Sequence, residues 1–423
     1  MPIQFLSILF IAIIFVYIRR RSILHPFVIT GTIWFIFVLA YELFATYYSK
    51  IPHLREKTIS YISLYLITFL IVTEIIIRKK DPPNLKKLIN ASPILNDRIE
   101  LLFTIIFVCN LFLIFRFFII THSFNIFSVI TTFRHLIVTG YNMPIDVKLL
   151  LYIYNITFVL LMYSYLYKPK VNSLIKYGII VEFILILLFI STKGKLLKYI
   201  IAFFVLLYIK GKLTPKVLLL TGSISIGAIC LLVYVRDAVF FKLGYYTASD
   251  YAFIYTLSPL PAFDYLISGD VEYTSGQFGA RTLGFFYRFL GTFFDIKMPD
   301  YSSGNMFIRV IGPTVLTPTN VYTAFGNYYM DFGKNGIIIY ATAISLLFSI
   351  LYKNINKRKY FFVYALTIFC LVLNFFGDFC FQFLSMTIQD IIAVFVVFLF
   401  RKARRPMLND YGKQKNMLYS FGL

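Results

Sequence analysis

The sequence predicts an all-α polytopic membrane protein with one long external loop. The chain is 59% hydrophobic and only 14% charged, whereas soluble domains are about 45–50% apolar and about 25% charged. Its mean hydropathy is +0.79. Apolar runs of about 18–20 residues recur along the chain, and each is long enough to cross the ~30 Å hydrocarbon core of a bilayer. These observations together predict a bundle of about eleven transmembrane helices.

More than half of the Lys and Arg residues gather in short clusters at the ends of apolar runs. The clusters are Arg19–Arg21, Arg78–Lys80 with Lys86 and Lys87, Lys168–Lys176, Lys210–Lys216, Lys353–Lys359 and Arg401–Lys415. Short cytoplasmic turns of membrane proteins collect basic residues in this way. We therefore attribute the net charge of +22 to topology, and we do not expect nucleic acid as a partner.

With these clusters on the cytoplasmic side, the spans alternate from a periplasmic N-terminus to a cytoplasmic C-terminus. The predicted spans are 3–18, 24–48, 58–77, 100–119, 147–167, 175–192, 196–209, 217–235, 335–352, 360–378 and 383–400. The chain then divides into a first transmembrane bundle, a long periplasmic loop, a second set of spans and a basic tail. These four parts cover 1–235, 236–334, 335–400 and 401–423.

Three shorter features of this topology carry expectations of their own. The outer segment 121–146 is amphipathic, which is typical of a helix lying along a membrane surface. The apolar stretch 282–294 has the length of a re-entrant half-span. Asp378 and Asp390 flank the turn between the last two spans, and we expect them at the interface, with a cavity-facing position as the alternative.

The loop 236–334 is the one long run without membrane character, so we expect the functional face there. Several common signatures are missing from the sequence. There is no Gly-rich phosphate loop, no H-E-x-x-H and no G-x-S-x-G. There is also no Asp-x-Asp of a metal-dependent glycosyltransferase and no C-x-x-C spacing. We therefore expect neither a metal nor another cofactor.

Basic residues on the outer face are candidates for binding phosphate. The arginines are Arg236, Arg281, Arg288 and Arg309 in the loop and Arg134 in the earlier outer segment. A guanidinium makes bidentate, always-charged contacts with phosphate, although each arginine alone fits an ordinary salt bridge equally well. Arg281 and Arg288 are seven residues apart, which predicts one shared helical face. Lys193 and Lys195 lie in an outer hairpin, as snorkelling lysines or as a phosphate site.

A general base and a sugar-binding surface are also sought among the outer residues. A base must accept a proton near neutral pH, and the candidates are Asp237, Asp331, His135 and Asp250. Asp331 directly precedes the span that begins at 335, and it fits an ordinary helix-entry acid equally well. Aromatic residues, Tyr322 among them, are dense in the loop, but aromatics also line every membrane interface.

One stretch of the loop resembles a known family. The run Asn320–Gly336, ending in Asp331-Phe-Gly333-Lys-Asn-Gly336, is similar to the stretch that follows the large external loop in bacterial O-antigen polymerases of the Wzy type. The hairpin Ser191–Lys195 corresponds to a Ser/Gly-rich basic outer hairpin of that family, with lysines where arginine is frequent. Arg236 matches an arginine at the start of the family's periplasmic loop.

The resemblance implies a GT-C-like helical bundle in the bacterial inner membrane and a glycosyltransferase activity. The enzyme would transfer a growing glycan from undecaprenyl pyrophosphate to the next lipid-linked repeat unit, with inversion at the anomeric carbon. The implied partners are the lipid-linked donor and acceptor, membrane lipid and a chain-length regulator protein. The implied catalytic residues are Asp331, Asp237 and Arg236. The implied substrate-binding residues are Arg281, Arg288, Arg309, Lys193, Lys195, Arg134, His135 and Tyr322.

Two other functions share part of this pattern. A flippase or exporter of lipid-linked sugars would also be basic and many-spanning, but it would normally have short loops on both faces and an internal repeat. An O-antigen ligase would share the long loop and the lipid donor. A non-catalytic envelope scaffold is a further and less favoured alternative.

Overall fold

A computed structural model describes most of the chain as helices in two compact units. The described residues are 2–78, 97–138, 143–190, 193–214, 216–217, 247–271, 279, 281–294, 308–319, 321–381 and 384–400. The first unit comprises residues 1–88 and 192–391, and the second comprises 89–191 and 392–423. The first unit therefore joins the first three predicted spans to the loop and to later helices. The linear division into four parts is a topological prediction and stays one.

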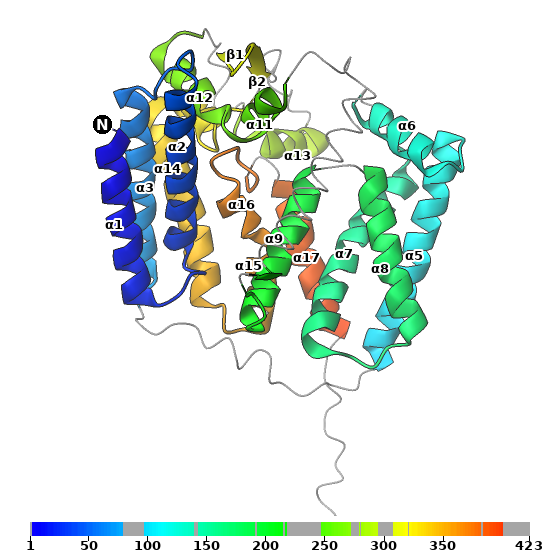
Figure 1. Cartoon of the computed structure of the whole chain (residues 1–423). Helices are drawn as coiled ribbons and strands as arrows, with labels where there is room; N and C mark the ends of the chain where they lie inside the picture. The colour runs from blue at the N-terminus through cyan, green and yellow to red at the C-terminus, as the bar shows by residue number, and fades with distance from the viewer. Residues whose placement is uncertain are drawn as a thin grey trace, which may run out of the picture. The chain divides into compact units, whose positions relative to one another are not determined.

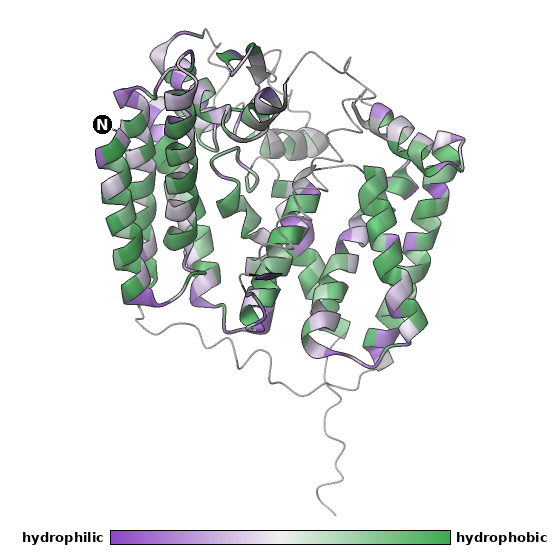
Figure 2. Cartoon of the chain, viewed as in Figure 1, coloured by the Kyte–Doolittle hydropathy of each residue, from purple (hydrophilic) through white to green (hydrophobic). Residues whose placement is uncertain are grey.

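Four long helices form the body of the first unit (Figure 1). They are α1 (Pro2–Arg20), α2 (Pro26–Tyr47), α3 (Glu56–Ile76) and α14 (Gly326–Lys353). Helix α2 begins with Pro26, whose fixed φ suits the first helical turn. Helix α14 packs against α3, and the ring of Tyr65 on α3 stacks on that of Tyr340 on α14 with centroids 5.9 Å apart. Apolar residues cover most of the length of these helices (Figure 2). This is the composition expected of helices in the hydrocarbon core of a bilayer.

The remaining elements of the first unit are shorter. They are α9 (Lys193–Ile209), α11 (Ala248–Thr256), α12 (Pro259–Ser268), α13 (Gly284–Phe294), β1 (Ile308–Ile311), β2 (Leu316–Thr319), α15 (Arg358–Thr367), α16 (Phe369–Val372) and α17 (Leu384–Phe400), whose last residues belong to the second unit. The strands β1 and β2 form an antiparallel hairpin with Ile308 opposite Thr319. This hairpin contacts α11 and α12, so part of the predicted loop folds into regular structure.

Polar contacts fasten helix α12 of the loop to the start of α3. The carboxylate of Asp264 accepts hydrogen bonds from the Arg55 amide and from the Thr58 hydroxyl. Arg55 also forms an ion pair with Asp270 at 2.7 Å, and this hydrogen bond raises the pKa of the Arg55 guanidinium. Lys57 donates to the backbone carbonyl of Ile267 at the end of α12. The loop is therefore held to the helical body at defined residues.

The second unit contains α5 (Asp97–Thr121), α6 (Ile126–Val138), α7 (Ile145–Tyr167) and α8 (Ser173–Ile190). The amphipathic outer segment thus contains a helix, α6. Inside the unit, Asn110 of α5 donates to the Thr157 hydroxyl of α7 at 3.1 Å. Such a buried polar contact joins two apolar helices at a fixed register.

Seven helices of the described chain are long and apolar enough to cross a membrane: α1, α2, α3, α5, α7, α8 and α14. This supports a multi-pass membrane protein. Helices α9 and α17 have 17 residues each. The predicted span 360–378 is not one helix, because α15 ends at Thr367 and α16 at Val372. The predicted span 217–235 lies almost wholly outside the described residues.

Candidate functional site

The candidate site is built on a break in helix α14. Gly333 has φ 58° and ψ −143°, a non-helical conformation that interrupts the helix seven residues after its start. Residues with a Cβ are disfavoured at such positive φ. Beyond the break, Gly336 comes so close to the first half of the helix that a Cβ there would lie 1.9 Å from the Tyr328 carbonyl oxygen. The two glycines of the Asp-Phe-Gly-x-x-Gly motif therefore shape the break.

Asp331 lies in the short helical piece before this break and binds a distant segment of the loop. Its Oδ2 accepts hydrogen bonds from the amide of Thr282 at 2.8 Å and from the Thr282 hydroxyl at 2.8 Å. The amide of Arg281 donates to the same oxygen at 3.1 Å and to Oδ1 at 3.3 Å. Hydrogen bonds to a carboxylate are stronger than neutral ones. Asp331 therefore anchors residues 281–282 beside α14.

The charge of Arg281 at this anchor acts on the phenol of Tyr322. Burial raises the pKa of the Tyr322 phenol to about 12, while the nearby Arg281 cation acts in the opposite direction. Only 6% of Tyr322 is exposed, and Arg281 is half-buried. The side chain of Arg281 is therefore close enough to Tyr322 to influence its ionisation. The structure thus brings together three of the predicted residues, Asp331, Arg281 and Tyr322.

The segment that carries Tyr322 is fixed to the core of the first unit. The ring of Phe325 stacks on Trp34 at 5.4 Å and meets Phe263 edge-on at 4.8 Å. The amide of Ala324 donates to the Asn374 carbonyl at 2.8 Å. Helix α14 starts directly after Phe325. The same contacts therefore fix the segment that carries Tyr322 and the beginning of the helix that carries Asp331.

A second carboxylate supports the first half of α14 from behind the site. Asp378 accepts a hydrogen bond from the Tyr328 hydroxyl at 3.0 Å and from the amides of Cys380 and Phe381 at 2.9 Å each. It is 3% exposed. These three donors compensate the burial of Asp378, and its expected interfacial position stays a prediction.

The arrangement can hold a cation and a phenol at a rigid position at the end of the helical body. Oδ2 of Asp331 already receives three donors, so that oxygen acts as an anchor. Oδ1 receives one long hydrogen bond and keeps capacity to accept another. The arginine and the phenol are donors suited to an oxyanion or a sugar hydroxyl. The geometry thus suits recognition of a phosphorylated or hydroxylated ligand, with Asp331 as the residue that positions Arg281.

One predicted relationship in the loop is wrong. Arg281 and Arg288 do not share a helical face, because helix α13 begins only at Gly284. Arg281 lies in the preceding turn, whose amides are taken by Asp331. The seven-residue spacing therefore describes a turn followed by a helix.

The other predicted residues are placed elsewhere or lie outside the described chain. Arg309 is exposed on strand β1. Lys193 and Lys195 lie in the first turn of α9, and Arg288 lies on α13. Arg134 and His135 belong to α6 of the second unit. Arg236 and Asp237 lie outside the described residues.

Asp250, a further candidate base, has a structural role. It forms a capping box with Thr247 at the start of α11. Its carboxylate also accepts hydrogen bonds from the amide and hydroxyl of Thr314 in the hairpin turn. Although burial opposes the shift, these hydrogen bonds hold its pKa below the usual value. The fully buried carboxylate of Asp250 therefore links helix α11 to the β1–β2 hairpin.

Sequence reasoning missed two partners. Thr282 supplies two of the donors to Asp331, and no local pattern marks it. Lys198 forms a buried ion pair with Asp390 at 2.5 Å, both residues being at most 4% exposed, and the interfacial position expected for Asp390 stays a prediction. Here a signal existed, because a lysine and an aspartate within two apolar segments are expected to pair.

The described residues contain no group of three or more His, Cys, Asp or Glu side chains placed to hold a metal ion. Comparisons of the chain with family models, with curated proteins and with solved structures found no match. Evidence on the function therefore comes from the chain's own residues and from the resemblance of its Asn320–Gly336 run.

Proposed function

We propose that this protein is an oligosaccharide repeat-unit polymerase of the bacterial inner membrane, acting at the periplasmic face. It would transfer a growing glycan from undecaprenyl pyrophosphate to the next lipid-linked repeat unit. The observation that carries the proposal is the cluster of Asp331, Arg281 and Tyr322. Asp331 of this cluster belongs to the Asp-Phe-Gly-x-x-Gly motif that resembles the polymerase family. The multi-pass helical architecture is compatible with a lipid-linked substrate.

In the proposed reaction, a hydroxyl oxygen of the acceptor sugar forms a bond to the anomeric carbon of the donor. The bond from that carbon to the pyrophosphate oxygen breaks, and undecaprenyl pyrophosphate leaves with the electron pair. A carboxylate, Asp237 or Asp331, takes the hydroxyl proton. Arg281 neutralises charge on the leaving group, as positioned cations do at other phosphate sites. Asp331 holds the backbone of Arg281 in place through the bonds described above.

The first test is the surface glycan of the host after deletion of the gene. Loss of polymerisation alone predicts a single-repeat band in place of the ladder on a gel, because export and ligation continue. Loss of every band, with repeat units trapped on lipid at the inner leaflet, would assign the protein as a flippase. Polymer that accumulates on the carrier lipid without reaching its final acceptor would assign it as a ligase.

Complementation then tests the site. Arg281→Gln keeps polar character but removes the cation, so we expect polymer formation to fall about 10²–10³-fold, the usual cost of losing one preorganised electrostatic contact. Arg281→Lys should retain part of the activity, because the charge remains while the bidentate fork is lost. Lys353→Gln, at the exposed far end of α14, is the matched control and should support a full ladder. A normal ladder from Arg281→Gln would refute this role.

A further inference from the structure

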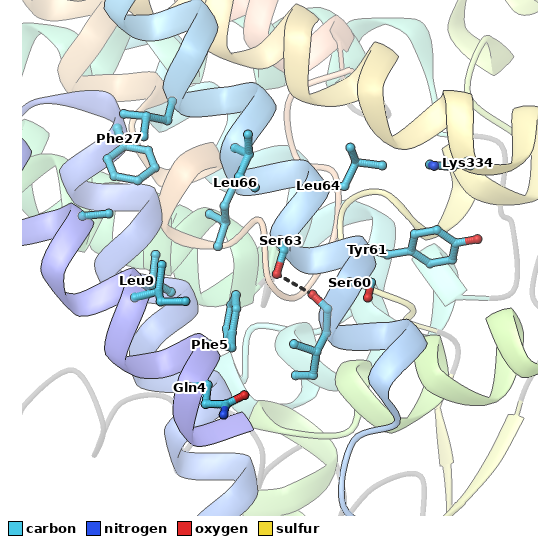
Figure 3. Close-up of a pocket in the computed structure, with 15 residues that line it drawn as sticks. Gln4, Phe5, Leu9, Phe27, Ser60, Tyr61, Ser63, Leu64, Leu66 and Lys334 are labelled. Atoms are coloured by element: carbon cyan, nitrogen blue, oxygen red, sulfur yellow. Dashed lines mark hydrogen bonds between the residues drawn. The ribbon is translucent and has the colours of Figure 1, made fainter. Parts of the chain in front are cut away.

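A groove of about 600 Å³ runs along helices α1 and α3 of the first unit (Figure 3). One wall comes from α1 between Gln4 and Ala12, and the other from α3 between Ile59 and Leu70. At about 1.5 Å per residue these walls are ~12 Å and ~17 Å long. The groove exists because α1 packs mainly on α2 and contacts α3 sparsely.

Most of the groove is apolar and faces outward. Figure 3 shows Phe5 and Leu9 along α1 and Leu64 and Leu66 along α3. Ile8 and Ile67 also line it, and they are 69% and 55% exposed. Exposed isoleucines on helices that are long and apolar enough to cross a membrane are suited to contact lipid chains. An apolar furrow of this length therefore suits one extended hydrocarbon chain.

Polar groups are concentrated where α1 and α3 begin. Gln4, Ser60 and Tyr61 line this part of the groove, and Gln4 and Ser60 are exposed. Lys334 of α14 lines the groove farther along, beside Leu64 (Figure 3). Deeper along α3, the Ser63 hydroxyl donates to the Ile59 carbonyl of its own helix at 2.8 Å (Figure 3), so it adds little polarity to the wall. The groove thus combines long apolar walls with polar groups. This combination matches the apolar and polar parts of an amphiphilic ligand.

Lys334 gives the groove its charge and connects it to the candidate site. It is exposed, and it is the one charged residue among the described residues that line the groove. Throughout the described part of the chain, no carboxylate forms an ion pair with it. Lys334 directly follows the break at Gly333 and is three residues from Asp331. Before that break in the sequence, the ring of Tyr329 lies beside the ring of Tyr61 in the groove, with centroids 5.6 Å apart.

We propose that this groove binds the polyisoprenyl chain of a lipid-linked substrate, with a phosphate of that lipid on Lys334. The proposal rests on the proposed function and adds the place where the carrier lipid sits. A lysine binds phosphate as a point charge, and the apolar walls bind the first isoprene units. The helix break then holds two phosphate-directed features, Lys334 on one side and the Asp331 anchor of Arg281 on the other.

The first experiment measures binding of undecaprenyl phosphate to the purified full chain in detergent by native mass spectrometry. Ala12→Phe fills the groove, so we expect Kd to rise about tenfold or more, the equivalent of losing burial of two methylene groups. Ile11→Phe is the matched control, because Ile11 lies on the same helix, does not line the groove and is 66% exposed. Equal affinity for both variants would overturn the proposal.

The second experiment tests the phosphate. Lys334→Gln should raise Kd for undecaprenyl phosphate about tenfold, whereas Lys334→Arg and Lys353→Gln should not. Undecaprenol, which has the same chain without the phosphate, should bind wild type and Lys334→Gln equally. If phosphatidylglycerol displaces undecaprenyl phosphate at equal concentration, the groove is a general lipid site and the proposal fails.

These binding measurements need no polymerisation, so the two proposals fail separately. An unchanged glycan ladder after gene deletion, together with groove-dependent binding of undecaprenyl phosphate, would refute the polymerase and keep the lipid site. A lost ladder, with binding insensitive to Ala12→Phe and Lys334→Gln, would keep the polymerase and refute the groove.

Discussion

Two aspartates of the loop region bind threonines in the same way and yet differ in what surrounds them. Asp250 accepts hydrogen bonds from the amide and hydroxyl of Thr314. Asp331 accepts them from the amide and hydroxyl of Thr282. Asp250 is fully buried and caps its own helix. Asp331 is half-buried, sits beside a helix break, and holds the arginine that lies near Tyr322.

Asp250 and Asp331 differ in their surroundings, although each binds a turn that is distant in the sequence. Both carboxylates tie a distant turn to a helix, so hydrogen-bond inventory alone does not distinguish them. What differs is the surroundings of the two carboxylates. The turn bound by Asp331 carries Arg281, and Asp331 lies two residues before the helix break at Gly333. Asp250 therefore has a structural role, and the proposed function gives Asp331 a role in positioning Arg281.

We expect the largest effect from a substitution that disrupts the close approach of the two halves of α14 next to Asp331. Gly336→Ala would place a Cβ 1.9 Å from a backbone oxygen, so the two halves of α14 must separate. We expect a loss of stability of about 3 kcal/mol and loss of polymer. Thermal unfolding in detergent and the glycan ladder are the measurements. Gly194→Ala is the control, because its Cβ would meet Phe379 at an ordinary 3.7 Å. Equal behaviour of both variants would remove the argument for a required close approach.

The next effect compares the two aspartates directly. Asp331→Asn replaces an acceptor oxygen by an amide, which releases residues 281–282, and misplacing a catalytic group in this way costs about 10²-fold in rate. Asp250→Asn should instead lower stability by about 2 kcal/mol, with polymer yield per folded protein unchanged. Yield normalised to folded protein in the membrane measures both. The distinction between the two residues collapses if Asp250→Asn lowers the normalised yield as much as Asp331→Asn does.

The smallest effect concerns acid. Hydrogen bonds from Thr247 and Thr314 lower the pKa of Asp250 in the folded protein below its usual value of 3.8, although burial opposes them. Because the folded pKa is depressed, its contribution to stability is complete above pH 3.8 and is lost as the pH falls through the folded pKa. The stability difference between wild type and Asp250→Asn should therefore shrink below pH 3.8. A difference that stays constant into stronger acid would contradict this linkage.

The sequence by itself determined the apolar helices and their approximate ends. Hydropathy is a local property, so the predicted spans 3–18, 58–77 and 147–167 each correspond to one long helix. The amphipathic pattern likewise indicated the segment that holds α6. Both glycines of the Asp-Phe-Gly-x-x-Gly motif have a local backbone role, at a helix break and at a close approach.

Partners were decided only by tertiary structure. Arg20 belongs to a basic cluster that marks topology, yet it is 2% exposed and paired with Glu74 at 2.5 Å. Span 360–378 is interrupted although its composition is apolar throughout. Asp331 meets the Arg281–Thr282 turn across about 50 residues of chain. Such long-range pairings depend on how whole elements pack, and a local pattern records only which residues seek a partner.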